Sequence, residues 1–142
     1  MSIVLINLNA DLVGMTWPTN PVLFNQEVVD TAGAFNPGVP GRIVTPAGKT
    51  LVRLEASFTV PDSGTSGGMF LKFYRNGVEM IGSWDQRRNA SGSYANNVCR
   101  GLAPWQACTP GDYFEIGVGV NGLGNPTVIS ASVNTWFAAS FE

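Results

Sequence analysis

The stretch Leu51-Val52-Arg53-Leu54-Glu55-Ala56-Ser57-Phe58-Thr59-Val60 decides the fold class, because apolar residues alternate with polar or small ones along its length. A period of two places apolar side chains on one face of a β-strand and polar ones on the other. We therefore predict a strand with one face in the core and one in water. Tyr113–Val120 repeats this pattern closer to the C-terminus.

Further strands are predicted on both sides of this stretch. Asn76-Gly77, a pair favoured in tight hairpin turns, separates Met69–Tyr74 from Val78–Trp84. The other candidate strands are Val22–Val29, Arg42–Val44, Val98–Ala107 and a long final strand, Thr127–Phe141. About eight strands with Gly and Pro between them are typical of a jelly roll. The prediction is an all-β, two-sheet antiparallel sandwich.

Composition narrows the class of function. Of 142 residues, 44% are hydrophobic and only 13% charged, and the net charge is −2. No stretch concentrates basic residues beyond Arg87-Arg88, so we expect no nucleic-acid partner. The longest apolar run, Ile3–Ile6, is too short to span a bilayer, and the N-terminus lacks signal-peptide features. We therefore expect that the chain is made in a cytoplasm and does not associate with a membrane.

Catalysis and metal binding find little support among the residues. The chain has His 0 and Cys 2, which removes histidine-based nucleophile triads and the usual zinc site. Cys99 and Cys108 are either buried thiols or a bridge that closes a hairpin around Ala103–Trp105. Asp30, Asp85 and Asp112 read as turn formers. We expect no enzyme activity, no catalytic residues, no cofactor and no metal.

The order of several motifs resembles the globular head of the complement first-component q subunit and the tumour necrosis factor jelly rolls. The motifs, spread over residues 22–141, are Asp30-Thr31-Ala32-Gly33-Ala34-Phe35, Pro46-Ala47-Gly48-Lys49-Thr50, Arg75-Asn76-Gly77, Pro110-Gly111-Asp112-Tyr113 and an aromatic-rich final strand. The resemblance implies a homotrimer with the final strand near the threefold axis. The sequence differs from the animal complement proteins in having no collagen-like stalk.

Residues 1–20 stand apart from this order, so we predict an N-terminal arm followed by a jelly-roll domain at 21–142. A free apolar arm would aggregate, and we expect it to contact a capsid or a neighbouring subunit. Its predicted contact residues are Ile3, Val4, Leu5, Ile6 and Leu8. Trp136 has the opposite parity to Phe137, so Trp136 and Asn134 are predicted at the trimer interface.

These features predict a bacteriophage virion structural protein, a trimeric capsid decoration or cement protein that is bound to the major capsid protein or another virion protein. Its arm and its trimer contacts would stabilise the shell. The alternative is a receptor- or carbohydrate-binding module at a phage tail or head-fibre tip, with a host surface glycan as ligand. Its candidate ligand-binding loop contains Trp84, Arg87, Arg88, Tyr94 and Trp105, since Trp and Arg are enriched in binding hot spots.

Overall fold

The computed structural model describes residues 1–13, 20–61, 68–88, 96–121, 127–128 and 135–142. Within these ranges every regular element is a strand, and no helix is long and apolar enough to cross a membrane. The strands are β1 (Ser2–Asn7), β2 (Leu12–Val13), β3 (Asn20–Pro21), β4 (Gln26–Asp30), β5 (Ile43–Val44), β6 (Leu51–Pro61), β7 (Gly68–Arg75), β8 (Val78–Arg88), β9 (Asn96–Ala107), β10 (Tyr113–Asn121), β11 (Thr127–Val128) and β12 (Trp136–Phe141).

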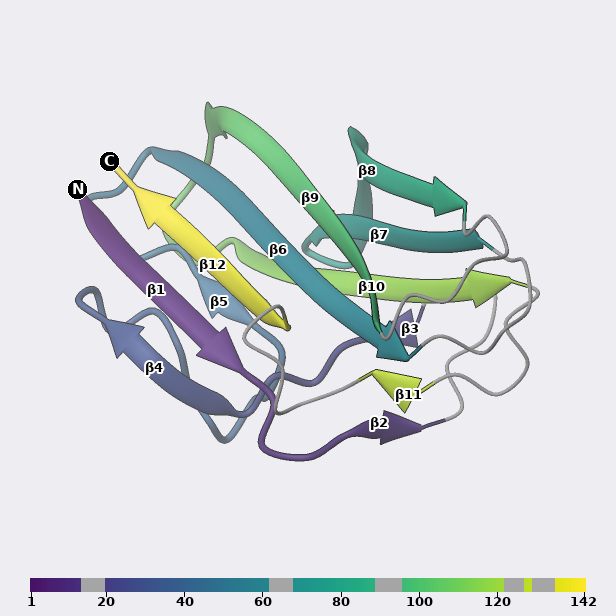
Figure 1. Ribbon diagram of the computed structural model, residues 1–142. Helices are drawn as coiled ribbons and strands as arrows, with labels where there is room; N and C mark the ends of the chain where they lie inside the picture. The colour runs from purple at the N-terminus through teal and green to yellow at the C-terminus, as the bar shows by residue number, and fades with distance from the viewer. Residues whose placement is uncertain (14–19, 62–67, 89–95, 122–126, 129–134) are drawn as a thin grey trace.

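Two five-stranded sheets form the sandwich (Figure 1). One sheet has the order β4-β1-β12-β6-β9, and the other has the order β3-β10-β7-β8 with β5 added to β10. A separate two-stranded ladder joins β11 to β2. All pairings are antiparallel, which confirms the predicted fold class.

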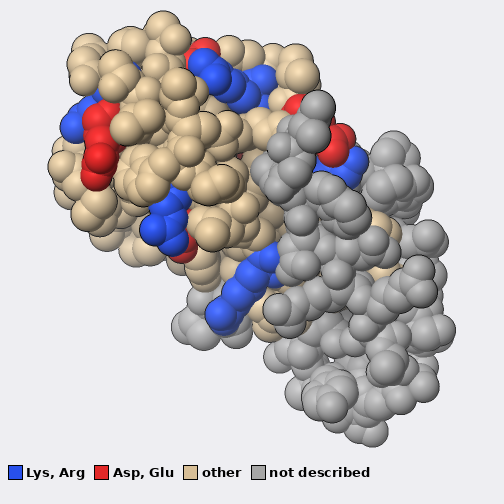
Figure 2. Space-filling model, turned by 90° about the horizontal axis from the view of Figure 1, so that it is seen from above, with Lys and Arg blue, Asp and Glu red and all other residues tan. Residues whose placement is uncertain are grey.

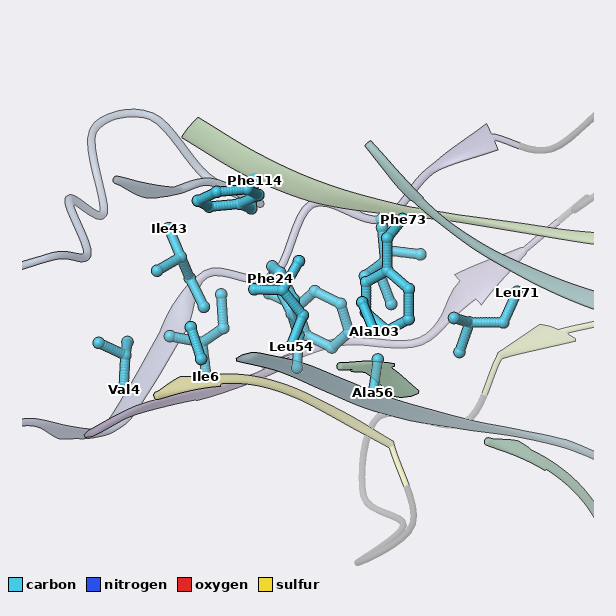
Figure 3. Packing of buried hydrophobic residues seen from close by; sticks show 14 of the residues in the cluster. Val4, Ile6, Phe24, Ile43, Leu54, Ala56, Leu71, Phe73, Ala103 and Phe114 are labelled. Atoms are coloured by element: carbon cyan, nitrogen blue, oxygen red, sulfur yellow. The ribbon is translucent and has the colours of Figure 1, made fainter. Parts of the chain in front are cut away.

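The core lies between the sheets and is lined by inward residues of β1, β5, β6, β7, β9, β10 and β12 (Figure 3). The alternating apolar residues of β6 are all buried, as predicted. Phe137 of β12 lies at the centre, with its ring centroid 6.1 Å from that of Phe24 and 6.3 Å from that of Phe73. Tilted aromatic pairs at this spacing add to the stabilisation from buried area. Phe137 therefore links the two sheets.

Two local features are a turn that the sequence predicts and a glycine at which the two sheets approach closely. Asn76 and Gly77 have φ angles of 52° and 78°, as the two-residue turn between β7 and β8 requires. Gly101 of β9 faces the other sheet, and a Cβ there would lie 2.6 Å from Cδ2 of Leu71. Only glycine lets the sheets approach this closely at β9.

The predicted N-terminal arm is wrong for its first eight residues. β1 lies inside the five-stranded sheet, where β12 pairs on one side and β4 on the other. Val4, Ile6 and Leu8 are buried in the core, so they are closed off from any capsid or neighbour. The sheet satisfies the backbone of this apolar run and removes Val4 and Ile6 from water, which leaves no free arm to protect.

The predicted final strand also differs. Its first residues form β11, which pairs with β2, and its last residues form β12, which pairs with β1 and β6. Residues 129–134 between them, which include Asn134, lie outside the described residues. The N- and C-termini lie side by side at one end of the sandwich, because Ser2 pairs with Phe141 (Figure 1).

Of the two alternatives for the cysteines, the buried thiols are confirmed, and the hairpin around Ala103–Trp105 with its disulfide is wrong. β9 is one continuous strand, and Pro104 and Trp105 together oppose Arg53 in a β-bulge. Cys99 and Cys108 are both buried and form no disulfide. Nine residues of extended strand separate their Cα atoms by more than about 20 Å, whereas a disulfide needs Cα atoms within about 7 Å.

Candidate assembly interface

The outer face of the five-stranded sheet carries the candidate site, and β12 runs along its middle. Phe137, Ala139 and Phe141 of β12 are buried, whereas Trp136, Ala138 and Ser140 point to the opposite side and are half-buried. This confirms the predicted parity of Trp136. The outward residues of β1, β6 and β9 complete the face.

A cross-strand row of Asn7, Trp136, Ser57 and Arg100 crosses four strands at the level of the indole. Side chains opposite one another on neighbouring strands are in contact distance. Ser57 is fully buried, although the alternation in β6 predicted a wet face there. The Ser57 Oγ and the Asn7 Oδ1 are buried and have no hydrogen-bond partner, a state that costs free energy unless something supplies one.

The next row along the strands contains Leu5, Ala138, Glu55 and Leu102. Leu102 is 51% exposed, and Ile3, one row further, is 42% exposed. The small side chain of Ala138 keeps the middle of the face low between these larger residues. Apolar side chains grouped on one sheet face, with polar residues around them, are typical of a protein interaction surface.

The two rows enclose a hollow of about 280 Å³ beside the indole. Its lining residues are Arg53, Glu55, Ala56, Arg100, Gly101, Leu102 and Trp136. Arg53 Nη2 lies 2.7 Å from Glu55 Oε1, so these two charges offset each other at the rim. The hollow therefore combines the apolar Leu102 and the aromatic Trp136 with the basic Arg100, in addition to the Arg53–Glu55 pair.

Both edges of this sheet are poor templates for adding another strand. β4 at one edge is only five residues long and carries Glu27 and Asp30 beside a bulge. β9 at the other edge contains Pro104, which has no backbone N–H to donate, in its own bulge. Short charged edges, prolines and bulges all oppose edge-to-edge pairing. A partner protein is therefore more readily bound at the outer face of this sheet than at either of its edges.

Charge is sparse over the molecule as well. In the view of Figure 2, acidic and basic side chains are scattered, and in several places lie beside one another. Arg42 Nε lies 2.8 Å from Glu115 Oε1 and its guanidinium covers the Tyr113 ring. The hydrogen bond from Arg42 to Glu115 raises the pKa of the arginine, despite an opposing effect of burial.

Of the three aspartates predicted to form turns, Asp30 and Asp112 do so, whereas Asp85 lies within β8 and pairs with Leu71. Asp30 accepts hydrogen bonds from the backbone N–H groups of Ala32 and Phe35 at 2.9 and 2.8 Å. Asp112 accepts from Arg75, from the Asn76 side chain at 2.7 Å and from the Thr109 N–H at 2.7 Å. Burial opposes the charged form of Asp112, but these hydrogen bonds outweigh it and lower its pKa.

The described part of the chain contains no cluster of metal-binding side chains and no activated nucleophile. Among those residues, no three His, Cys, Asp or Glu side chains come together as a metal site. Burial raises the pKa of the Cys108 thiol, although a hydrogen bond with Thr45 partly opposes the shift, so this cysteine is a poor nucleophile.

One predicted member of the candidate ligand-binding loop, Trp105, lies apart from Arg88. β8 extends to Arg88, where the chain pairs with Gly68 at one end of β7. Trp105 lies towards the other end of the sandwich, where the nearby Ala107 carbonyl accepts a hydrogen bond from Arg75. Gly68 and Arg75 are roughly 23 Å apart along the strand, so Trp105, which is 40% exposed, is remote from Arg88.

The remaining members of that loop fall at or beyond the described region. Trp84 pairs with Lys72 in the middle of β8, and Arg87 pairs with Met69. The side chains of Trp84, Arg87 and Arg88 lie outside the described residues, as does Tyr94 entirely. Sequence reasoning missed Leu102 as a member of the outer face, and it missed the burial of Ser57. The outward parity of Ser57 was visible in β6, but that of Leu102 depends on the register of β9.

The fold is similar to known structures, although the sequence is not similar to known families. The chain matches no protein-family model and no curated protein sequence. Among solved structures it is similar to murine APRIL at pH 8.5, with a TM-score of 0.66 and 12% identity over 97% of this chain and 96% of that one. A second APRIL structure, at pH 8.0, gives a TM-score of 0.67 at 12% identity over the same shares.

These matches show the fold alone at such low identity. The class is a tumour necrosis factor-like jelly roll, as the order of sequence motifs predicted. The specific resemblance to the complement q-subunit head and the phage origin stay predictions.

Proposed function

We propose that this chain is a non-catalytic binding domain that assembles as a homotrimer through the outer face of its five-stranded sheet. The observation that carries the proposal is the face itself, with Trp136 at its centre and Leu102, 51% exposed, beside a hollow of about 280 Å³. The tumour necrosis factor-like fold supports three copies, since the resemblance implies a threefold axis near the final strand. A second copy removes the apolar face from water.

The shape of the sheet edges supports a second copy as the occupant. The Asn7 Oδ1 and the Ser57 Oγ are already buried within the single chain, so the outward side chains of Trp136 and Leu102 make the contact with the second copy. The bulged edges β4 and β9 direct association to the face, which favours closed assembly over open sheet extension. Each contact is then made three times in one particle.

A charge placed on this face tests the proposal. We expect the unaltered chain to have the molar mass of three copies by light scattering, and Leu102→Arg to have the mass of one copy with an unchanged circular dichroism spectrum. Val78→Arg is the matched control, because Val78 is 70% exposed on the other sheet. It should remain a trimer. A single-copy mass for the unaltered chain, or a trimer of Leu102→Arg, would contradict the assignment.

The finer proposal is that the trimer decorates a phage shell as a cement protein. Its support is the low charge of the chain, the absence of a basic patch and the gain in avidity that three equivalent copies give to weak contacts. The buried Val4, Ile6 and Leu8 have no part in it, so shell contacts belong to exposed surfaces of the trimer. Co-sedimentation with shells assembled without the chain should retain the trimer and lose Leu102→Arg. Equal retention of both would contradict the avidity argument.

A further inference from the structure

The turn between β7 and β8 contains a chemically reactive pair held in an unreactive arrangement. In an Asn-Gly sequence the glycine N attacks the asparagine Cγ, the Cγ–Nδ2 bond breaks and ammonia leaves. Water then opens the resulting succinimide to aspartate or isoaspartate. Asn76 and Gly77 form such a pair, and both are exposed to the water that the reaction consumes.

Hydrogen bonds hold the Asn76 amide at both ends. Its Nδ2 donates to Asp112 Oδ1 at 2.7 Å, and its Oδ1 accepts from the Tyr113 N–H at 2.9 Å. The Asn76 N–H also donates to the Tyr113 carbonyl at 2.9 Å. Cyclisation requires the amide to turn towards the Gly77 N, which breaks the side-chain bonds. The clamp therefore opposes the reaction as long as Asp112 stays in place.

Asp112 is itself fixed by two further donors. The Arg75 guanidinium and the Thr109 N–H, the latter at 2.7 Å, donate to its Oδ2 and leave Oδ1 directed at Asn76. These contacts join the β7–β8 turn to the start of β10. The clamp is thus a link between two strands of one sheet, and it belongs to no part of the proposed trimer face.

We propose that Asn76 is a deamidation site that Asp112 keeps closed, and that its reaction breaks the clamp irreversibly. An aspartate at 76 places a carboxylate where an amide donor faced the Asp112 carboxylate, so attraction becomes repulsion. An isoaspartate adds a methylene to the backbone of a two-residue turn whose geometry has no room for it. Loss of the clamp therefore releases the turn from β10.

Peptide mapping by mass spectrometry, in a mildly alkaline buffer, measures the conversion of Asn76 directly. In the folded chain we expect it to be about tenfold or more slower than in the urea-unfolded chain, because two hydrogen bonds must break before attack. Asn121-Gly122, the other Asn-Gly pair of the sequence, provides a reference for the same chemistry in the urea-unfolded chain.

Variants separate the clamp from general stability. Asp112→Ala should accelerate Asn76 conversion in the native state, whereas Glu115→Ala, which removes an ion pair from β10 just after Asp112, should leave it unchanged. Asp112→Asn retains an oxygen acceptor, so it tests the clamp even if Asp112→Ala does not fold. We expect its rate of Asn76 conversion to lie between those of the unaltered chain and Asp112→Ala. Equal rates for folded and unfolded Asn76, or an unaltered rate in folded Asp112→Asn, would overturn the proposal.

Discussion

The inner and outer faces of β12 carry similar chemistry but have different surroundings. On the inner face Phe137, Ala139 and Phe141 are fully packed against the other sheet by the chain itself. On the outer face Trp136, Ala138 and Ser140 are half-buried, and Leu102 of β9 is 51% exposed. Under the proposed assembly, a single copy completes one side of this sheet and a second copy covers the other.

The largest expected effect comes from opening the inner face. Phe137→Ala removes the ring that joins Phe24 and Phe73, and we expect the free energy of unfolding to fall by about 3–5 kcal/mol. Urea denaturation followed by circular dichroism measures this. A loss under about 1 kcal/mol would mean that the core is not organised around Phe137.

A smaller effect should follow from overfilling the same face at its edge. Gly101→Ala places a methyl group 2.6 Å from Leu71 Cδ2 and 3.1 Å from Phe73 Cε2, so the sheets must separate or Leu71 must change rotamer. We expect a loss of about 1–3 kcal/mol in the same urea experiment. An unchanged midpoint would show that β9 packs less closely on β7 than described.

The outer face should respond in the opposite direction. Ser57→Ala removes a buried hydroxyl that has no partner, and we expect the single-copy Leu102→Arg background to gain about 1 kcal/mol or less. The double variant is compared with Leu102→Arg alone by urea denaturation. A clear loss of stability would show that Ser57 Oγ is hydrogen-bonded after all.

The smallest expected effect is the loss in acid of the stabilisation that Asp112 provides at one end of the sandwich. The pKa of Asp112 is lowered in the folded chain, so its contribution is fully present above the ordinary aspartate pKa of about 3.9 and is lost as pH falls through the folded value. The difference in urea midpoint between the unaltered chain and Asp112→Asn should be constant near neutrality and shrink in acid. A difference that grows in acid would reverse the sign.

Sequence reasoning reached the strands whose alternation is strong and local. The buried side of β6 and the opposite parities of Trp136 and Phe137 follow from a period of two, and the Asn76-Gly77 turn follows from its two residues. The place of β1 did not follow, because Ile3–Ile6 is an unbroken apolar run and its partner strand lies at the other end of the chain. Long-range pairing leaves no local pattern.

Bulges account for the rest of the misreading at the candidate site. Pro104 reads as a turn residue, but in the structure it occupies a bulge of an edge strand, which shifts the register beyond Leu54. That shift sets where Trp105 lies and separates it from Arg88. Neither the strand order nor the bulge is encoded in the spacing of these residues along the chain.

The dependence of the thermal unfolding midpoint on protein concentration tests the central claim most directly. Trimerisation linked to folding raises the midpoint as concentration rises, by mass action. Over about a hundredfold range in concentration, we predict a rising midpoint for the unaltered chain and for Val78→Arg, and a constant one for Leu102→Arg. A midpoint of the unaltered chain that does not change with concentration would contradict assembly through the outer face.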